Sequence, residues 1–154
     1  MIRRLGDEAT AALIGDYHRT VTAAVEAHDG IVLERSGDHV LAVARNASDA
    51  ARAAAAVRDA LRDFAWPPEC DVAVSIALHS GRWSGDPRRP AAGTALSRLM
   101  RLAKAAEPGQ VLVSQATAAL LEGDRRAPAL RSLGERTIED FDEPTRVYEL
   151  IEPQ

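Results

Sequence analysis

Residues 30–45, GIVLERSGDHVLAVAR, place a Ser-Gly-Asp turn between two apolar runs, and this stretch constrains the fold more than any other. Short β-branched and aliphatic runs on both sides of a Gly-Asp pair predict a β-hairpin. Asp38 then lies at the tip of a sharp turn, where a carboxylate is well placed to hold a divalent cation such as Mg²⁺. The alternative is that Ser36, Gly37 and Asp38 are present because turns favour these residue types.

Composition excludes several classes of protein. The 154 residues carry a net charge of −4, so the chain has no overall basic field for nucleic acid or an acidic membrane surface. The single cysteine, Cys70, excludes an internal disulfide framework, and no Cys/His cluster has zinc-ligand spacing. No apolar run is long enough to span a bilayer, and the first residues lack the apolar core of a secretion signal. We therefore expect a cytoplasmic protein.

Apolar periodicity predicts the remaining elements. Helices are expected at residues 7–28, 49–64, 94–106 and 115–122, and strands at residues 70–80, 110–114, 130–138 and 146–151. Asn46 or Ser48 can cap the second helix, and Ser114 can cap the last. The inward face of the third helix is predicted to carry Leu96, Leu99, Met100 and Ala103. This order predicts one α+β domain, residues 1–154, with a ferredoxin-like antiparallel sheet and helices on one face.

Several phrases in series resemble class III nucleotidyl cyclase catalytic domains, the adenylate and guanylate cyclase fold. They occur in the same order as in the family and extend over nearly the whole chain. Each phrase alone is a weak indication of the family, but the series together is specific. The phrases are residues 4–9 (RLGDEA), 24–30 (AVEAHDG), 36–38 (SGD), 77–81 (ALHSG), 101–102 (RL), 108–114 (PGQVLVS), 142–144 (DEP) and 147–150 (VYEL).

The resemblance implies chemistry at an interface between two such domains. In the family, two aspartates hold two divalent ions on a nucleoside triphosphate, the ribose 3′-hydroxyl attacks the α-phosphate, and pyrophosphate leaves. Asp38 matches the second of these aspartates, and Mg²⁺ or Mn²⁺ is implied if the chain is active. Arg101 matches the arginine that stabilises the transition state, with a solvated helix arginine as the alternative.

Other positions depart from the family pattern. Ser97 stands where the family has a ribose-orienting Asn, and a hydroxyl offers fewer hydrogen-bonding groups than an amide. Glu34 stands at the base-reading position and is the guanine-type residue. Its partner position falls near Pro90, which has no N–H and no polar side chain, so an exposed strand glutamate is the favoured interpretation. Glu139 and Asp140 replace a phosphate-binding Lys or Arg and would repel a triphosphate.

The family's first strand, which is central in the sheet and carries the other metal-binding aspartate, has no counterpart in this sequence. The resemblance therefore implies an N-terminally truncated version of the fold, unless the start of the sequence is set too late. Strands on either side of the missing one would carry unpaired N–H and C=O groups. We predict that another segment fills this position, from the N-terminus or by exchange with a partner chain.

The leading interpretation is a degenerate, catalytically inactive class III cyclase-like domain that acts as a dimerising regulatory or nucleotide-sensing module in signalling. It would form a homodimer or a heterodimer with another cyclase-like chain. The alternative is an active adenylate or guanylate cyclase, alone or as a heterodimer half that lends Arg101 to its partner. Binding of a nucleoside triphosphate could use an arginine cluster, with a solvated loop as the other interpretation. The cluster comprises Arg82, Arg88, Arg89, Arg98 and Arg101.

Overall fold

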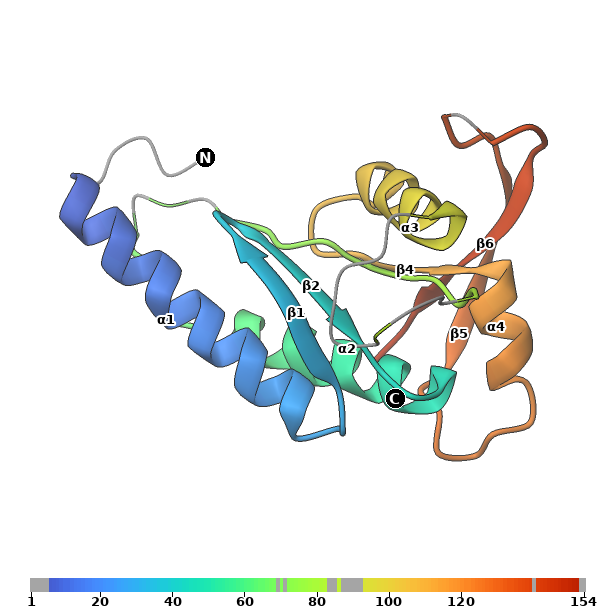
Figure 1. Ribbon diagram of the computed structural model, residues 1–154, viewed down its shortest axis with the longest axis horizontal. Helices are drawn as coiled ribbons and strands as arrows, with labels where there is room; N and C mark the ends of the chain where they lie inside the picture. The colour runs from blue at the N-terminus through green and yellow to red at the C-terminus, as the bar shows by residue number, and fades with distance from the viewer. Residues whose placement is uncertain are drawn as a thin grey trace.

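A computed structural model describes residues 6–68, 70, 72–82, 86, 93–139 and 141–152, with helices and strands in the predicted order (Figure 1). The helices are α1 (Asp7–Glu26), α2 (Ala47–Arg62), α3 (Thr94–Ala105) and α4 (Gln115–Leu121). The strands are β1 (Ile31–Ser36), β2 (His39–Val43), β3 (Ile76–Leu78), β4 (Val111–Ser114), β5 (Leu130–Arg136) and β6 (Thr145–Leu150). None of the described helices is long and apolar enough to cross a membrane.

The strands form two sheets. β1 and β2 make the predicted hairpin as a separate two-stranded sheet, and the other strands lie in the order β3-β4-β6-β5. β3 and β4 run parallel, whereas β6 runs antiparallel to both β4 and β5. The α+β class is confirmed, and the parallel pair makes the larger sheet mixed instead of wholly antiparallel. This pair arises because the chain crosses over through α3 between β3 and β4.

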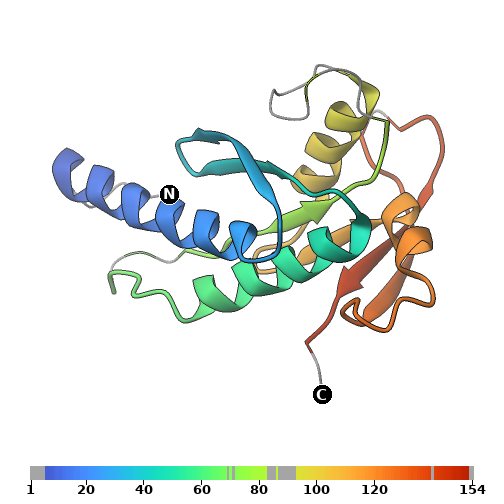
Figure 2. The ribbon, with the colours of Figure 1, turned by 60° about the horizontal axis from the view of Figure 1, so that its bottom comes forward.

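α1 and α2 pack against each other and form one layer (Figure 2). The hairpin packs on α1, and β3 packs on α2. One face of α1 is buried, because residues about four apart share one helix face, and it carries Leu13, Tyr17, Val21 and Val25. α2 begins after Asn46, whose side chain accepts a hydrogen bond from the Asp49 N–H at 2.8 Å. The core between the two helices contains Tyr17, Val21, Val25, Val57 and Leu61.

The turn from α1 into the hairpin depends on two residues. Asp29 adopts a left-handed conformation with φ 58°, which a short polar side chain tolerates. Gly30 then passes so close to the helix that a Cβ at this position would lie 2.6 Å from Cγ1 of Val25. The glycine is required there by this close approach, and it lets the chain reverse directly onto α1.

Two predictions on the next elements differ from the structure. Of the described residues in the strand predicted at 70–80, only Ile76–Leu78 pair with a neighbour, because β4 begins at Val111 and does not reach past Ile76. In α3, the prediction that Met100 faces inward was wrong: Met100 is 43% exposed, whereas Leu102 is 2% exposed and joins a buried cluster. Leu102 packs with Leu112 and Val147 of the sheet.

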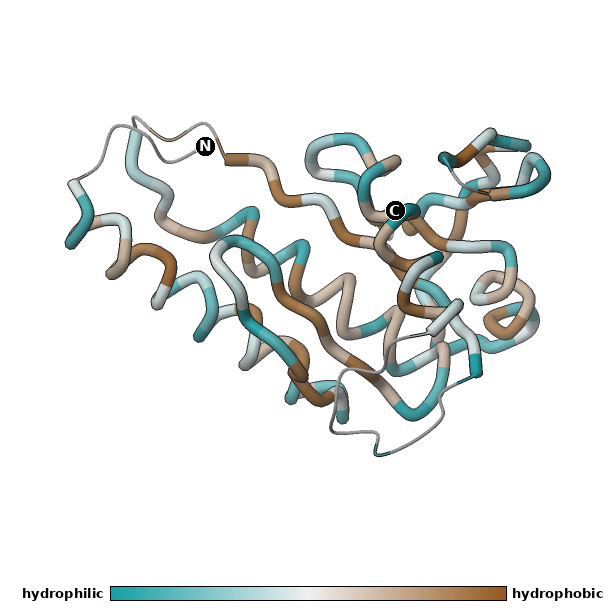
Figure 3. Tube along the Cα trace, turned by 45° about the horizontal axis from the view of Figure 1, so that its top comes forward, coloured by the Kyte–Doolittle hydropathy of each residue, from teal (hydrophilic) through white to brown (hydrophobic). Residues whose placement is uncertain are grey.

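The two sheets are not joined by a strand in the described part of the chain, since β2 pairs only with β1 and β3 pairs only with β4. Figure 3 shows hydrophobic residues recurring along both the hairpin and residues 72–78, on either side of this junction. That another segment fills the position remains a prediction, and residues 1–5, which it invoked, lie outside the described residues.

Candidate functional site

The tip of the hairpin is held against α1 by two hydrogen bonds. Gly37 occupies the first position of the two-residue turn with φ 57°, a conformation that favours glycine in hairpin turns. The Tyr17 hydroxyl donates to the backbone carbonyl of Asp38 at 3.1 Å. Nε2 of His18 donates to the carbonyl oxygen of Gly37 at 2.8 Å. The sequence therefore positions Asp38 on a tip that is fixed to α1, a helix with one buried face, and not on a loose loop.

The carboxylate of Asp38 points to solvent, and its side chain is 71% exposed. Nδ1 of the neighbouring His39 donates to its Oδ1 at 2.8 Å. The charge also acts on the helix below: burial, and then the negative charge of Asp38, raise the pKa of the Tyr17 hydroxyl. Tyr17 therefore stays neutral and remains a donor to the hairpin over the ordinary range of pH.

The residues around Asp38 do not fit a two-metal site. Mg²⁺ and Mn²⁺ prefer several oxygen ligands in octahedral geometry, and a two-metal site requires carboxylates that bridge both ions. Asp38 brings one carboxylate, and its immediate partner is an imidazole. In the part of the chain that the structure describes, no three His, Cys, Asp or Glu side chains gather into a group that could hold a metal ion.

Helix α3 carries the other two predicted site residues on one face. Ser97 and Arg101 are one turn apart, so their side chains are neighbours on the helix surface. Ser97 is exposed, and its N–H bonds to the carbonyl of Gly93 at 3.0 Å in the first helical turn. The Arg101 side chain is 30% exposed, and its guanidinium lies 4.0 Å from the carboxylate of Glu139. The structure thus brings the predicted transition-state arginine next to an acid.

The predicted arginine cluster is only partly assembled among the described residues. The guanidinium of Arg98 lies 5.7 Å from the centre of the Phe141 ring, a cation–π contact. Arg101 faces Glu139, and Arg82 is exposed. Four other residues of the predicted site region lie outside the described residues: Arg88, Arg89, Pro90 and Asp140.

Glu34 lies in β1 on the exposed side of the hairpin, opposite Leu41 and next to a register shift. Glu34 and Asp38 belong to the hairpin on α1, whereas Ser97 and Arg101 belong to α3, which packs on β3 and β4. Figure 1 shows the hairpin and α3 as separate parts of the molecule. Within one chain the four predicted residues therefore form two groups.

A polar network at the carboxyl ends of β3 and β4 was not predicted as a unit. His79 Nδ1 and Ser114 Oγ share a hydrogen bond of 2.9 Å, and Thr117 Oγ1 lies 3.0 Å from Ser80 Oγ and 3.2 Å from Ser114 Oγ. Burial, and then the positive charge of Arg98, lower the pKa of His79. The one residue of this network that the sequence marks is Ser114, the predicted cap of α4. Its side chain accepts a hydrogen bond from the Thr117 N–H, as expected of a cap.

Comparison with known proteins places this arrangement in a known fold. No protein-family model matches the sequence, and no curated protein matches it. Solved structures do match. The adenylyl cyclase CyaB from P. aeruginosa superimposes with a TM-score of 0.70 at 18% identity, over 99% of this chain and 87% of that one. The chain has the fold of class III nucleotide cyclase catalytic domains.

Two fungal structures agree with this assignment. The guanylate cyclase domain of RhGC from Catenaria anguillulae, solved in complex with GTP, has a TM-score of 0.76 at 12% identity and covers 99% of this chain and 89% of its own. A dimeric guanylyl cyclase domain from Blastocladiella emersonii has a TM-score of 0.74 at 13% identity, with coverages of 97% and 87%. At these identities the likeness establishes the cyclase fold, and the role of each side chain has to be argued from its own surroundings.

Proposed function

We propose that this chain is a degenerate class III cyclase-like domain that does not catalyse cyclisation on its own and acts as a dimerising regulatory or nucleotide-sensing module. The observation that carries the proposal is the contact between Arg101 and Glu139, whose charged groups lie 4.0 Å apart. A transition-state arginine acts through a positive charge directed at the phosphates. Here part of that charge is already offset by a carboxylate of the same chain.

The electrostatics of this contact oppose triphosphate chemistry. A unit charge pair at about 4 Å interacts by about 1 kcal/mol in water and more where water is excluded. A carboxylate at that distance from Arg101 weakens the attraction for phosphate and repels the phosphate itself. Ser97, one turn away, adds a single hydroxyl to this face of α3. Lost positioning and lost charge stabilisation each reduce rates by orders of magnitude.

The hairpin tip adds a second argument. Asp38 is the one predicted metal ligand of the sequence, and its described surroundings supply an imidazole instead of a second carboxylate. This donor set does not support a catalytic step through a metal. A regulatory role does not need one, because the fold and the site are separable properties of a domain.

We further propose that the domain works as a homodimer or as a heterodimer with another cyclase-like chain, in the cytoplasm. The dimeric fungal domain of the same fold supports this proposal. The guanylate cyclase domain from Catenaria anguillulae was solved in complex with GTP. This complex supports a nucleoside triphosphate as the ligand if the present domain senses nucleotides. In this chain the cationic face of α3, with Arg98 and Arg101, would be the contact for the phosphates.

The alternative is an active adenylate or guanylate cyclase, alone or as half of a heterodimer. Asp38 favours it, because an exposed carboxylate on a tip fixed by Tyr17 and His18 is rigid and accessible to a metal nucleotide. In a heterodimer this chain would lend Arg101 to a partner that supplies the metal ligands. Glu139 opposes this version as well, since it stays beside Arg101 whichever chain binds the metal.

The experiment is a calorimetric titration of the purified chain with ATP and with GTP, with and without Mn²⁺, in which cyclic nucleotide and pyrophosphate are followed in the same samples. Binding without turnover supports a nucleotide sensor, and no binding leaves dimerisation as the function. Turnover that Asp38→Asn abolishes and Asp29→Asn leaves unchanged would establish the active alternative. Asp29 is a matched control because it is an aspartate at the other end of the same hairpin.

A further inference from the structure

The two arginines on α3 have different electrostatic surroundings. The guanidinium of Arg101 lies 4.0 Å from the carboxylate of Glu139, which offsets part of its positive charge. The guanidinium of Arg98 lies instead over the ring of Phe141, at 5.7 Å from the ring centre. An aromatic face attracts a cation through its quadrupole and brings no formal negative charge. Phe141 therefore holds Arg98 without neutralising it.

The ring of Phe141 is held in place by buried contacts. Its N–H donates to the carbonyl of Ile138 at 3.0 Å, which closes a tight turn. Ile138 is 3% exposed and belongs to the same buried cluster as Leu102, and Phe141 packs against that cluster. Leu102 lies one turn after Arg98 on α3, so the two side chains are neighbours on the helix. The contacts that hold α3 on the sheet thus also bring the ring next to Arg98.

Arg98 is exposed, so a ligand can reach it from solvent. A guanidinium that lies over a ring keeps the N–H groups at its edge available, and their planar fork matches the oxygen atoms of a phosphate. The charge of Arg98 also acts on the sheet, because burial, and then this positive charge, lower the pKa of His79. An anion bound at Arg98 would offset the charge and raise the pKa of His79 again.

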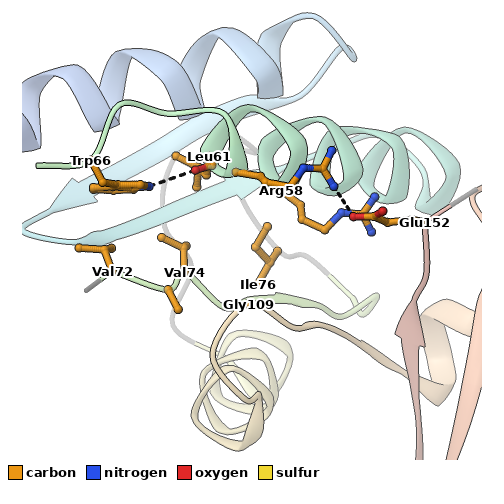
Figure 4. A pocket seen from close by; sticks show the side chains of 10 residues that line it. Arg58, Leu61, Trp66, Val72, Val74, Ile76, Gly109 and Glu152 are labelled. Atoms are coloured by element: carbon orange, nitrogen blue, oxygen red, sulfur yellow. Dashed lines mark hydrogen bonds and ion pairs between the residues drawn. The ribbon is translucent and has the colours of Figure 1, made fainter. Parts of the chain in front are cut away.

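The arginines of α2 do not offer a comparable anion site. Figure 4 shows Arg58 and Glu152 at one end of a cavity of about 260 Å³, with Trp66 at the other end. Arg58 donates to the carbonyl of Leu150 at 3.3 Å, and Arg62 forms an ion pair with Glu152. These guanidinium groups are bound within the chain, and the other residues that line the cavity are apolar. The exposed cation over an aromatic ring is on α3.

We propose that Arg98, positioned by the ring of Phe141, is the residue of α3 that binds the phosphates of a nucleoside triphosphate, and that Arg101 contributes less. The inference rests on the proposed nucleotide-sensing function and deepens it, because it assigns the phosphate contact to one residue and the positioning of that residue to another. The chain has a net charge of −4 and does not attract anions as a whole. Phosphate binding therefore depends on this local contact.

The test is a calorimetric titration of the full chain with inorganic tripolyphosphate. This probe has a phosphate chain but neither ribose nor base, so it binds without any possibility of cyclisation. Arg98→Gln should weaken binding by about tenfold or more, since it removes charge-assisted hydrogen bonds. Arg101→Gln is the matched control, because it removes the same charge one turn away. It should weaken binding by about fivefold or less, as expected for an exposed charge that is already offset.

Two variants of Phe141 test its positioning role. Phe141→Leu keeps an apolar side chain on the buried cluster but removes the aromatic face, and it should weaken tripolyphosphate binding by about two- to fivefold. Phe141→Tyr keeps the aromatic face and should retain the parent affinity. Rescue by the second ring separates positioning of Arg98 from packing alone, and a denaturant titration of both variants shows that each is folded.

The pKa of His79, followed by NMR, reports where the probe binds. Saturating tripolyphosphate should raise this pKa in the parent chain and in Arg101→Gln, because the bound anion offsets the positive charge of Arg98. At the same probe concentration the rise should be smaller in Arg98→Gln. This readout depends neither on turnover nor on the stability of the variants.

Four outcomes would overturn the inference: no binding of tripolyphosphate at millimolar concentration, a loss in Arg101→Gln as large as that in Arg98→Gln, equal affinity of the two Phe141 variants, or an unchanged pKa of His79 in the bound chain. The proposed function fails on a different result, the formation of cyclic nucleotide from ATP or GTP. Turnover would leave a phosphate contact at Arg98 standing, and an absence of tripolyphosphate binding would leave dimerisation standing.

Discussion

The bond from Tyr17 to the hairpin gives the most direct test of how Asp38 is positioned, and Tyr17→Phe removes that bond alone. The ring stays packed in the core, where it lies 6.2 Å from the ring of Trp66, so no cavity forms. The carbonyl of Asp38 that loses its donor belongs to an exposed residue and can bond to water instead. The cost is then that of one neutral hydrogen bond, about 1 kcal/mol. For a chain of this size, this corresponds to a fall in Tm of about 2–4 °C.

The pH dependence of stability separates this cause from a general loss of packing. The pKa of Tyr17 is raised above its ordinary value of 10.0 in the folded chain. The neutral phenol is therefore favoured by folding, and its contribution is present below pH 10 and lost as the pH rises further. Tyr17→Phe lacks the ionisable group, so the variant should lose less stability than the parent between pH 10 and the raised pKa.

The assay is thermal unfolding across this pH range, combined with amide exchange at the hairpin tip. Faster exchange at Gly37 and Asp38 is expected in Tyr17→Phe, while the exchange of β4 stays as it is. Tyr148→Phe, on β6, is the matched control. Equal alkaline destabilisation of Tyr17→Phe and the parent, or unchanged exchange at the tip, would show that the Tyr17 hydroxyl does not hold the hairpin.

Three further predictions follow from other contacts. Leu102→Ala should lower the free energy of unfolding by about 2–5 kcal/mol in a denaturant titration, and Met100→Ala, on the exposed side of α3, by less than about 1 kcal/mol. The lowered pKa of His79 means that its neutral form is favoured in the folded chain, so stability should fall as the pH drops below 6.5, and this loss should be absent in His79→Gln. If the titration detects a triphosphate, Glu139→Gln should tighten its binding by up to about fivefold, since removing one exposed negative charge is worth about 1 kcal/mol, and an unchanged Kd would exclude that residue as a repulsive group.

The local elements could be predicted from the sequence because their causes are local. The hairpin follows from Gly37 and its apolar flanks, α2 is capped by Asn46, one of the two predicted caps, and α4 is capped by Ser114. Each of these depends on residues within a few positions of one another. The cyclase fold was also predicted, because short sequence motifs that resemble the family occur in the family's order along the chain.

Features set by contacts over long sequence separations were missed. β3 is short because its pairing depends on β4, which lies more than thirty residues later and is itself only Val111–Ser114. Leu102 replaced Met100 in the core because the orientation of α3 is fixed by the sheet and not by the helix. For the site, the sequence marked Arg101 and Glu139 separately, and only the folded chain shows their charged groups 4.0 Å apart.

Whether the domain catalyses cyclisation is decided by titration of the chain with ATP and GTP in Mn²⁺, with cyclic nucleotide and pyrophosphate quantified in the same samples. The account predicts that neither product forms, whether or not nucleotide binds, and that Glu139→Gln changes binding without producing turnover. Stoichiometric formation of cyclic nucleotide and pyrophosphate by the parent chain, lost in Asp38→Asn, would contradict it.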